Sequence, residues 1–281
     1  MELTEEISEI CGALTGDGWI ESRESSLYLA GHPIDDKNYY DNHMIPLFSR
    51  NVIKVKPKNF KYWKVYGFSL YNKKIIKEFI KLGIQKGKKV YSCKIPKWCF
   101  NSKNLMIGFL RGIFDTDGCV FCGKSYKTKN NFRKNFHHDI RIRIISVSLD
   151  LIKGIRILGR KLGIQFTKIK TKKAGKNMTK NNRDSYFIEL NKNSEIIKWF
   201  EILKLSGNDK HITKYKIWKK FGFCPPYTNI KERQKILKGD INPHSYYVGV
   251  PEWSNGVESN RPSSRPIGLV PTQVRTLSPT F

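Results

Sequence analysis

The chain has 281 residues and carries 52 Lys and Arg against 24 Asp and Glu, a formal net charge of +28. Such a charge repels itself unless a polyanion neutralises it, which indicates a nucleic-acid partner. No apolar run is long enough to span a bilayer, and no signal peptide or basic amphipathic anchor is visible, so we expect no membrane association. The length suffices for one large or two small domains.

The first predicted element is a helix that ends at an Asp-Gly pair. Ser8, Gly12 and Gly16 recur every four residues and therefore share one helix face. A stripe of small residues lets a second helix backbone approach closely. Glycine inside a helix costs about 1 kcal/mol relative to alanine, so the stripe needs a packing reason. The helix is predicted to end at Asp17, with Gly18 in the left-handed conformation.

The rest of the first half is predicted as strand, strand, helix, strand, strand, helix. Alternating apolar and polar residues indicate the later strands, and a helical pattern with a terminal Gly83 indicates the last helix. The predicted ranges are a hairpin of 18–21 and 26–30, a helix over 35–50 that Pro46 shortens or bends, strands over 52–56 and 63–70, and a helix over 73–82.

A second helix with the same features follows one hundred residues later. Gly108, Gly112 and Thr116 repeat the four-residue spacing, and Asp117-Gly118 ends the segment. A single Asp-Gly pair is most simply a turn, but two pairs at matched positions predict a tandem duplication. The two aspartates would then lie side by side at the end of a helix pair, where the helix dipoles favour a cation.

The second half repeats the order of the first. The predicted ranges are a hairpin of 119–123 and 140–146 with a long basic connection over 124–138, a helix over 149–162, strands over 166–172 and 185–190, and helices over 194–205, 211–220 and 228–237. The fold class is therefore α+β, with two αββαββα halves related by a pseudo-twofold axis. We expect the first repeat at 1–98 and the second at 99–242.

Both Asp-Gly segments resemble the LAGLIDADG motif of homing endonucleases. Residues 10–18 have the sequence ICGALTGDG, and residues 110–118 have the sequence LRGIFDTDG. The resemblance covers about residues 3–235 and is specific to single-chain members with two motifs. Two departures stand out: Thr15 replaces a frequent acid, and Ala13 replaces the usual leucine. The resemblance implies motif helices packed at the centre, with Ser8, Gly12, Gly108 and Gly112 at their interface, and a curved antiparallel sheet in each half that forms a DNA-binding saddle.

The function implied by the resemblance is site-specific cleavage of both DNA strands, which spreads a mobile element by intron homing. Such hydrolysis of phosphate esters needs an activated water and neutralised charge, which Mg²⁺ supplies when carboxylates hold it, with Mn²⁺ as a substitute. Asp17 and Asp117 are the expected metal ligands and catalytic residues, helped by the backbone carbonyls of Gly16 and Thr116.

The resemblance also implies a lysine near each scissile phosphate. Lys89 and Lys210 each follow the last helix of a half, and Lys94 begins a Lys-Ile-Pro segment. We expect Lys89 or Lys94 to assist catalysis together with Lys210.

Basic residues alternate along the predicted strands and would face the DNA major groove. A solvated charged face is the simpler explanation for any one strand, but acids are nearly absent from these faces, which favours contact with phosphates and base edges. The expected DNA-binding residues are Lys54, Lys56, Lys64, Arg141, Arg143, Lys168 and Lys170.

The six cysteines are scattered, mostly in apolar runs, which predicts free thiols in a reducing compartment. Cys119-x-x-Cys122 is one pair, too few ligands for a zinc site. We expect a monomer in a prokaryotic cytoplasm, associated with the nucleoid, with an organelle as the less favoured place.

Beyond residue 242 the composition changes, because lysine disappears while proline, serine and glycine dominate. A disordered tail is predicted over 243–281, and its removal should leave activity unchanged. The codons allowed for residues 249–256 and 274–276 can spell two parts of a transfer RNA gene. We therefore expect that the reading frame runs into such a gene and that the tail has no function of its own. Two other functions stay open: an RNA maturase that binds its host intron RNA, and a DNA-binding regulator on the same scaffold that does not cut.

Overall fold

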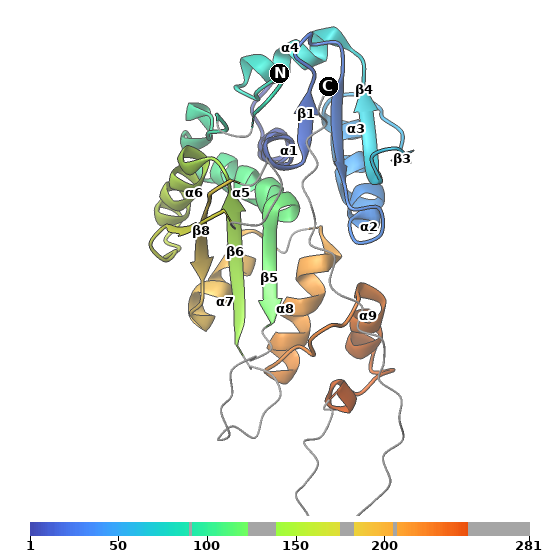
Figure 1. The fold of residues 1–281 in the computed structure, drawn as a ribbon, viewed down its shortest axis with the longest axis vertical. Helices are drawn as coiled ribbons and strands as arrows, with labels where there is room; N and C mark the ends of the chain where they lie inside the picture. Colours follow the sequence, from blue (N-terminus) through green and yellow to red (C-terminus); the bar gives the residue numbers. More distant parts are fainter. Residues whose placement is uncertain (90–91, 123–138, 175–182, 205–206, 247–281) are drawn as a thin grey trace, which may run out of the picture.

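A computed structural model describes residues 1–89, 92–122, 139–174, 183–204 and 207–246 (Figure 1). The first half contains α1 (Glu5–Gly16), β1 (Gly18–Ile20), β2 (Leu27–Gly31), α2 (Lys37–Tyr39), the π-helical turn η1 (Tyr40–Met44), α3 (Ile45–Asn51), β3 (Lys58–Phe60), β4 (Val65–Leu70) and α4 (Lys73–Lys81). The second half contains η2 (Lys97–Phe100), α5 (Lys103–Asp117), β5 (Gly118–Cys122), β6 (Ile140–Ser146), α6 (Leu149–Lys161), β7 (Lys170–Lys172), β8 (Ser185–Leu190) and α7 (Asn193–Ile202). The chain continues through α8 (Asp209–Phe221), α9 (Ile230–Lys238) and η3 (Pro243–Tyr246).

The two halves contain sheets of the same topology. The strand orders are β1-β2-β4-β3 and β5-β6-β8-β7, and every pairing is antiparallel. The predicted α+β fold with two matched halves is therefore confirmed. In Figure 1, α1 and α5 lie between the blue strands of the first half and the green to yellow strands of the second.

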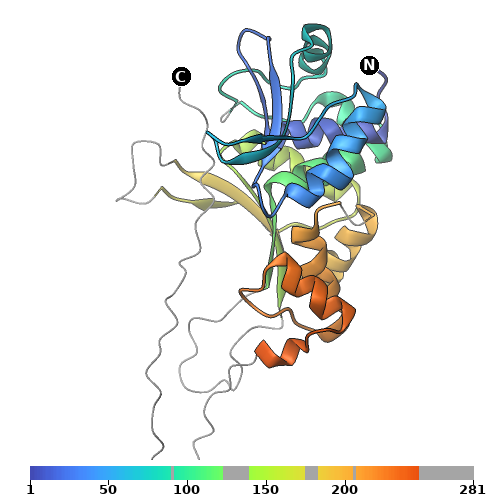
Figure 2. The same ribbon diagram turned by 90° about the vertical axis from the view of Figure 1, so that its right-hand side faces the viewer.

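Most helices lie on one side of the strands, as the view turned by 90° shows (Figure 2). Residues on alternate strand positions, such as Leu27, Leu29 and Phe68, point into the core on that side. The residues between them, such as Tyr28 and Ser69, are only partly buried. Each sheet therefore keeps one open face.

Three predicted strands differ from the structure: one is absent, and two are shorter than predicted. The range 52–56 was wrong: these residues form an unpaired segment in which Val52, Ile53 and Val55 pack against the core. The alternation of apolar and polar residues in this segment reflects its packing against the core and not hydrogen bonding to another strand. The range 63–70 begins at Val65 because a turn with Lys64 at φ 54° precedes it. The range 166–172 shrinks to β7.

The helix predicted over 35–50 consists of three pieces. α2 passes into the π-helical turn η1, and α3 begins with Pro46 in its first turn, where a missing amide hydrogen does no harm.

Side-chain caps fix the starts of the two central helices. Thr4 accepts a hydrogen bond from the amide of Ile7, and Ser102 accepts one from the amide of Leu105.

The C-terminal part has two helices and a short turn. α8 ends at Gly222 in the left-handed conformation, and α9 begins with a capping box between Asn229 and Glu232. Pro243–Tyr246 of the expected tail form η3, and residues 247–281 lie outside the described part, as does the basic connection over 124–138. No helix in the described ranges is both long and apolar enough to cross a membrane.

Candidate active site

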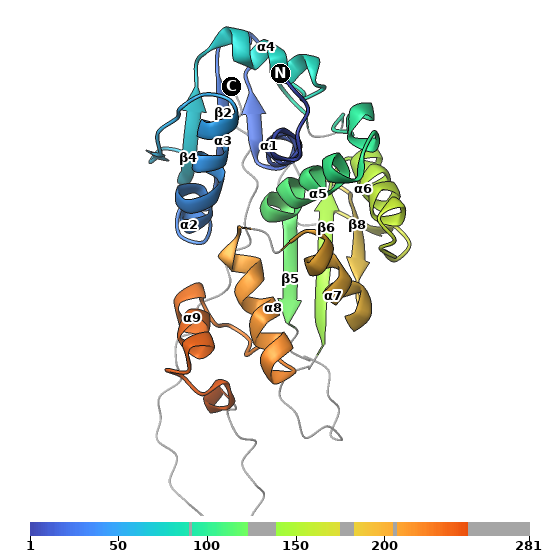
Figure 3. The same ribbon diagram turned by 180° about the vertical axis from the view of Figure 1, so that it is seen from behind.

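The small residues of α1 and α5 form the predicted helix interface. A Cβ on Gly12 would lie 2.2 Å from the carbonyl oxygen of Phe109, and one on Gly112 would lie 2.0 Å from that of Glu9. Gly108 meets the carbonyl oxygen of Glu5 at 2.2 Å in the same way. Seen from behind, the two helices lie side by side between the sheets (Figure 3). Backbone atoms therefore pack directly on backbone atoms.

Ser8 adds a direct bond across this interface. Its hydroxyl donates to the carbonyl oxygen of Leu105 at 2.6 Å. At the other end, a Cβ on Gly16 would lie 2.1 Å from Oγ1 of Thr116 and 3.3 Å from Cγ of Asp117. The close approach thus continues to the point where the aspartates stand.

Gly18 and Gly118 do not have the left-handed conformation predicted for them. Gly118 has φ −78° and ψ 160°, and Gly18 is also absent from the glycines with positive φ. The reason for glycine is steric. A Cβ would lie 2.5 Å from the carbonyl oxygen of Leu14 at Gly18, and 2.4 Å from that of Phe114 at Gly118. After α1 and after α5, the backbone turns back so closely against the preceding helix that a side chain at Gly18 or Gly118 has no room.

Asp17 and Asp117 come together at the end of the interface. Burial, together with the charges of Asp117 and Asp36, raises the pKa of Asp17 to about 8, against the opposing effect of Lys210 and Lys89. Burial likewise raises the pKa of Asp117 to about 6. Both side chains keep some exposure to solvent. The pair is therefore a partly buried site in which two carboxylates repel each other.

Asp36 is a third carboxylate at this site, and both of its oxygens are engaged in hydrogen bonds or an ion pair. It accepts hydrogen bonds from the amide of His32 at 2.9 Å and from Nδ2 of Asn208 at 3.0 Å. It also pairs with Nζ of Lys210 at 2.9 Å. A Cβ on Gly31 would contact carboxylate oxygens of both Asp36 and Asp17, so the two acids are neighbours. Asp36 therefore holds Lys210 beside Asp17.

Lys89 lies at the C-terminus of α1. Its Nζ donates to the carbonyl oxygens of Leu14, Thr15 and Gly16, each at 2.8 Å. A cation is stabilised there by the unpaired carbonyls and the helix dipole. Burial lowers the pKa of Lys89, although the charges of Asp117 and Asp17 oppose this. The ammonium group thus lies between the helix end and the aspartates.

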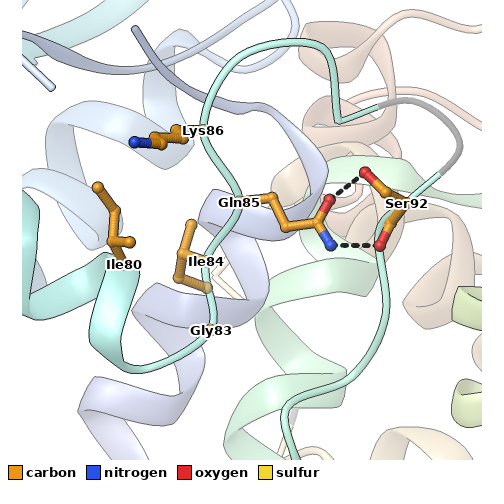
Figure 4. Close-up of a pocket in the computed structure, with 6 residues that line it drawn as sticks. All are labelled: Ile80, Gly83, Ile84, Gln85, Lys86 and Ser92. Carbon is orange, nitrogen blue, oxygen red and sulfur yellow. Dashed lines mark hydrogen bonds between the residues drawn. The ribbon is translucent and has the colours of Figure 1, made fainter. Parts of the chain in front are cut away.

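A closed loop after α4 brings Lys89 to this place. Gln85 and Ser92 hydrogen-bond each other across the loop, with the amide and hydroxyl groups facing as Figure 4 shows. The amide of Gly87 donates to the carbonyl oxygen of Ile20 at 2.8 Å, and Lys86 pairs with Glu24. The loop is therefore anchored to β1, directly after Asp17 in the chain.

Residues 104–203, in the second half of the chain, match the model of the LAGLIDADG-like domain. The matched region holds α5 with Asp117, and the first half repeats its topology. No curated protein sequence matches the chain significantly.

Several solved structures are similar to this chain at low identity. The homing endonuclease I-DmoI in complex with DNA and Mn is 14% identical, with 71% of this chain and 96% of that chain covered and a TM-score of 0.45. A point mutant of I-SmaMI is 13% identical, with 86% and 98% covered and a TM-score of 0.48. Full-length DUF199/WhiA from Thermotoga maritima is 12% identical, with 84% and 66% covered and a TM-score of 0.43.

The donor set around Asp17 and Asp117 fits a divalent cation. Two carboxylates with raised pKa values face each other, so their mutual repulsion is not fully relieved by the two lysines. The buried hydroxyl of Tyr40 has no hydrogen-bond partner among the described residues, although the charges of Asp17 and Asp36 act on it. Oxygen donors of this kind suit Mg²⁺ or Mn²⁺. The carbonyl of Gly16, predicted as a helper, already accepts a bond from Lys89.

The predicted DNA-contacting residues divide unequally between the sheets. Arg141 and Arg143 lie on one face of β6, and Lys170 begins β7. Acids were expected to be nearly absent from this face, but one acid lies at its centre. Glu189 of β8 is paired in register with Arg143 and accepts its Nε and a terminal nitrogen at 2.9 and 2.6 Å, and Nζ of Lys170 at 3.0 Å. Two of the three cations are therefore already paired, while Arg141 is exposed.

The open face of the first sheet is aromatic instead of basic. Tyr28 lies at its centre, with ring centroids 5.4 Å from Trp19, 5.7 Å from Phe60, 5.5 Å from Trp63 and 6.4 Å from Tyr71. We call these five side chains the aromatic cluster. No row of lysines crosses this face in the described residues. The placement of Lys54, Lys56 and Lys64 on strands was wrong, since all three are residues of connecting segments, and so is Lys168 ahead of β7.

Three residues of the site, Asp36, Asn208 and Tyr40, have no clear signal in the sequence. Asp36 and Asn208 are 172 positions apart and meet only in the fold. The hydroxyl of Tyr40 reaches the site from η1, a turn that no pattern predicted. Lys94, by contrast, is exposed, and no contact within the described residues joins it to the aspartates. The roles of Lys89, Lys94 and Lys210 in catalysis stay predictions.

Proposed function

We propose that the protein is a site-specific endonuclease that hydrolyses both strands of duplex DNA with Mg²⁺. The observation that carries this proposal is the meeting of Asp17 and Asp117, from two separate helices, between Lys89 and Lys210. A carboxylate pair of this kind has no evident structural role, because neither carboxylate makes a hydrogen bond or an ion pair with another described residue. Its placement at the pseudo-twofold axis suits a substrate with two antiparallel strands.

The residues around the pair suit attack on a phosphodiester. Asp17 and Asp117 would hold the ion, which when bound activates water and neutralises phosphate charge. Lys210, fixed by Asp36, places a positive charge on one side of the pair, and Lys89 places one at the helix end. Pre-positioned cations stabilise the extra negative charge that develops on phosphate oxygens during hydrolysis.

Duplex DNA is the proposed substrate because of the charge and the two open faces. A net charge of +28 favours a polyanion, and exposed arginine on a strand suits contacts with phosphates and guanine edges. Affinity should fall steeply with salt, with log K falling by about 0.9 per phosphate contact per decade of salt. A nearly flat salt dependence would argue against any nucleic acid.

The test is cleavage of DNA that spans the empty insertion site, by Asp17→Asn and Asp117→Asn variants. Each variant keeps the size of the side chain but loses a negative ligand. We expect at least about a 100-fold loss of double-strand cleavage, with target binding retained or tighter. Asp150→Asn, an exposed change on α6 whose side chain is 75% accessible, is the matched control.

Two results would contradict this proposal. Normal cleavage by both asparagine variants would show that the aspartates are not catalytic. Loss of folding or of DNA binding in both would show that they hold the structure instead, and circular dichroism with a gel-shift assay separates these cases.

A second candidate, RNA binding in support of intron splicing, is favoured by the aromatic cluster. Sequence-specific RNA recognition commonly stacks unpaired bases on aromatic rings. Tyr71 is 60% exposed and Tyr62, in the adjoining turn, is 93% exposed. This function would not need the carboxylate pair, so splicing of the host intron by the Asp17→Asn, Asp117→Asn double variant would favour it.

A further inference from the structure

The helices α8 and α9 form an extension that belongs to neither repeated half. They follow α7, the last helix of the second half, and they lie beyond the matched domain at 104–203. Neither sheet takes a strand from them. α8 packs against β5 and α9, and α9 lies at the end of the molecule away from α4 (Figure 1). We propose that the outer faces of this extension bind duplex DNA outside the segment that the two sheets contact.

The extension is attached to both halves. Apolar residues of α8 and α9 form a small core of their own, and Cys122 at the end of β5 packs against it. Nζ of Lys214 donates to the carbonyl oxygen of Val120 in β5 at 2.9 Å. Toward the first half, Nδ2 of Asn38 in α2 donates to Oδ2 of Asp209 at 2.6 Å. Its charged faces are therefore held in place before binding, which lowers the entropic cost of contact with a partner.

The outer faces of both helices consist almost entirely of lysine. On α9 the lysines recur four and seven residues apart, so they share one face, opposite the buried Arg233 and Ile236. On α8 they recur three and four residues apart, and every exposed residue of that helix is one of them. We call this set of six the extension lysines: Lys216, Lys219 and Lys220 on α8, and Lys231, Lys235 and Lys238 on α9.

Acids do not neutralise the extension lysines. None of the six forms an ion pair with a residue that the structure describes, whereas on α4 Lys81 pairs with Glu78 at 2.8 Å. The acids of the extension have other places: Asp209 accepts hydrogen bonds, Glu232 closes the capping box of α9, and Asp240 lies past the end of that helix. Like charges concentrated in this way repel each other, and a polyanion relieves the repulsion.

The chemistry of the extension suits the DNA backbone and not the base edges. The ammonium group of lysine is a point charge that contacts phosphate, whereas the fork of arginine is the usual bidentate partner of guanine. The one arginine of the extension, Arg233, is buried and donates to Thr213 and Thr228. Contacts made by the extension lysines are therefore expected to be independent of base sequence.

One extension on a chain of two halves makes the contact with DNA unequal on its two sides. α8 is joined to β5 of the second half, and in the described residues no matching pair of helices follows α4 of the first. α9 has nine residues and is about 14 Å long, which spans about four base pairs. The protected DNA should thus reach further on the side of the second sheet. This inference rests on the proposed function, which places a duplex across the two sheets.

The experiment is hydroxyl-radical footprinting of the full-length chain on a duplex of about six helical turns, centred on the empty insertion site. Asp17→Asn and Asp117→Asn in all proteins keep the DNA intact. We expect protection that extends about four base pairs or more further on one side. Adding Lys231→Gln, Lys235→Gln and Lys238→Gln should remove protection at that edge alone, and replacing the flanking sequence should leave it unchanged.

The matched control removes the same charge at the other end of the molecule. Lys73→Gln, Lys74→Gln and Lys77→Gln change three exposed residues of α4 and should keep the whole footprint. In a salt titration of duplex binding, the α9 variant should lose at least about tenfold in affinity and about 2 to 3 in the slope of log K against log salt. The slope of the α4 variant should match that of its parent.

Three results would overturn this proposal: an evenly centred footprint in the parent, a complete footprint in the α9 variant, or the same loss in the α4 variant. The salt titration needs neither cleavage nor a specific site, so it tests the extension on any duplex even if the endonuclease function fails. Equal slopes for the two triple variants would then also overturn the proposal, whereas a lower slope for the α9 variant alone would support it.

Discussion

The open faces of the two sheets differ, although the sheets share one topology. The face of the second sheet carries Arg141, Arg143 and Lys170 around the acid Glu189. The face of the first sheet carries the aromatic cluster around Tyr28. The two halves therefore share a topology and a helix interface, while their open faces differ. Cations suit phosphates and guanine edges, whereas aromatic rings suit stacking and apolar contact.

The largest expected effect tests the part that the halves share. Gly12→Ala and Gly112→Ala each place a methyl group about 2 Å from a backbone oxygen, which cannot move aside as a side chain would. We expect each to lower the free energy of unfolding by roughly 3 kcal/mol or more, by overpacking, as measured by urea denaturation. Gly154→Ala on α6 is the control, since the atoms nearest to its Cβ, at 2.9 Å, belong to the side chain of Ile95, which can shift where a backbone oxygen cannot. Unequal losses of stability in the two variants would show that the two halves do not contribute equally to the helix interface.

Loss of the central aromatic ring should matter less, and mainly for stability. Tyr28→Ala removes the contacts of one ring with four neighbours on a partly exposed face. We expect about 2 kcal/mol of destabilisation and an unchanged salt dependence of duplex binding. Tyr62→Ala, at a side chain that is 93% exposed, should change stability by less than about 0.5 kcal/mol. A marked loss of duplex affinity from Tyr28→Ala at unchanged stability would show that the first face contacts DNA directly.

On the second face, the exposed Arg141 is the test of phosphate contact. Arg141→Gln should weaken DNA binding and reduce the slope of log K against log salt by about 0.9. Arg156→Gln on α6, exposed on a helix instead of the strand face, is the matched control. Equal losses from both variants would mean that only total charge matters and that the face has no special role.

The smallest predicted effect concerns Glu189 and pH. Burial raises the pKa of Glu189, but hydrogen bonds from Arg143 and Lys170 outweigh it, so the pKa is below its usual 4.5. A lowered pKa contributes stability above about pH 4.5 that is lost as the pH falls through the folded value. Glu189→Gln should therefore flatten the acid side of the stability curve. It should also tighten DNA binding modestly by releasing Arg143. Weaker binding would show that Glu189 positions the arginine for contact.

The central helices and the order of elements could be predicted from the sequence because they depend on short-range patterns. Small residues four apart and an offset of one hundred residues are visible in the chain itself, and they define the interface. Strand ends were harder. Val52, Ile53 and Val55 alternate because they pack from an unpaired segment, and a period of two cannot distinguish packing from pairing.

The electrostatics of the site could be predicted only in part. Asp17 and Asp117 follow from the repeat, but Asp36 enters through a contact with Asn208, 172 positions away. Glu189 reaches Arg143 only through strand register. Such partners depend on the tertiary fold, which explains why the face predicted to lack acids holds one.

The interface of α1 and α5 has a consequence for folding. One hydrophobic cluster includes Ile10 and Leu14 of the first half together with Ile113 and Phe114 of the second, and backbone contacts are reciprocal across the two helices. Neither half can open without exposing the apolar stripe of the other. The two repeats should thus melt in a single calorimetric transition, as one cooperative unit. A chain severed between them would yield fragments that regain structure only on reassociation.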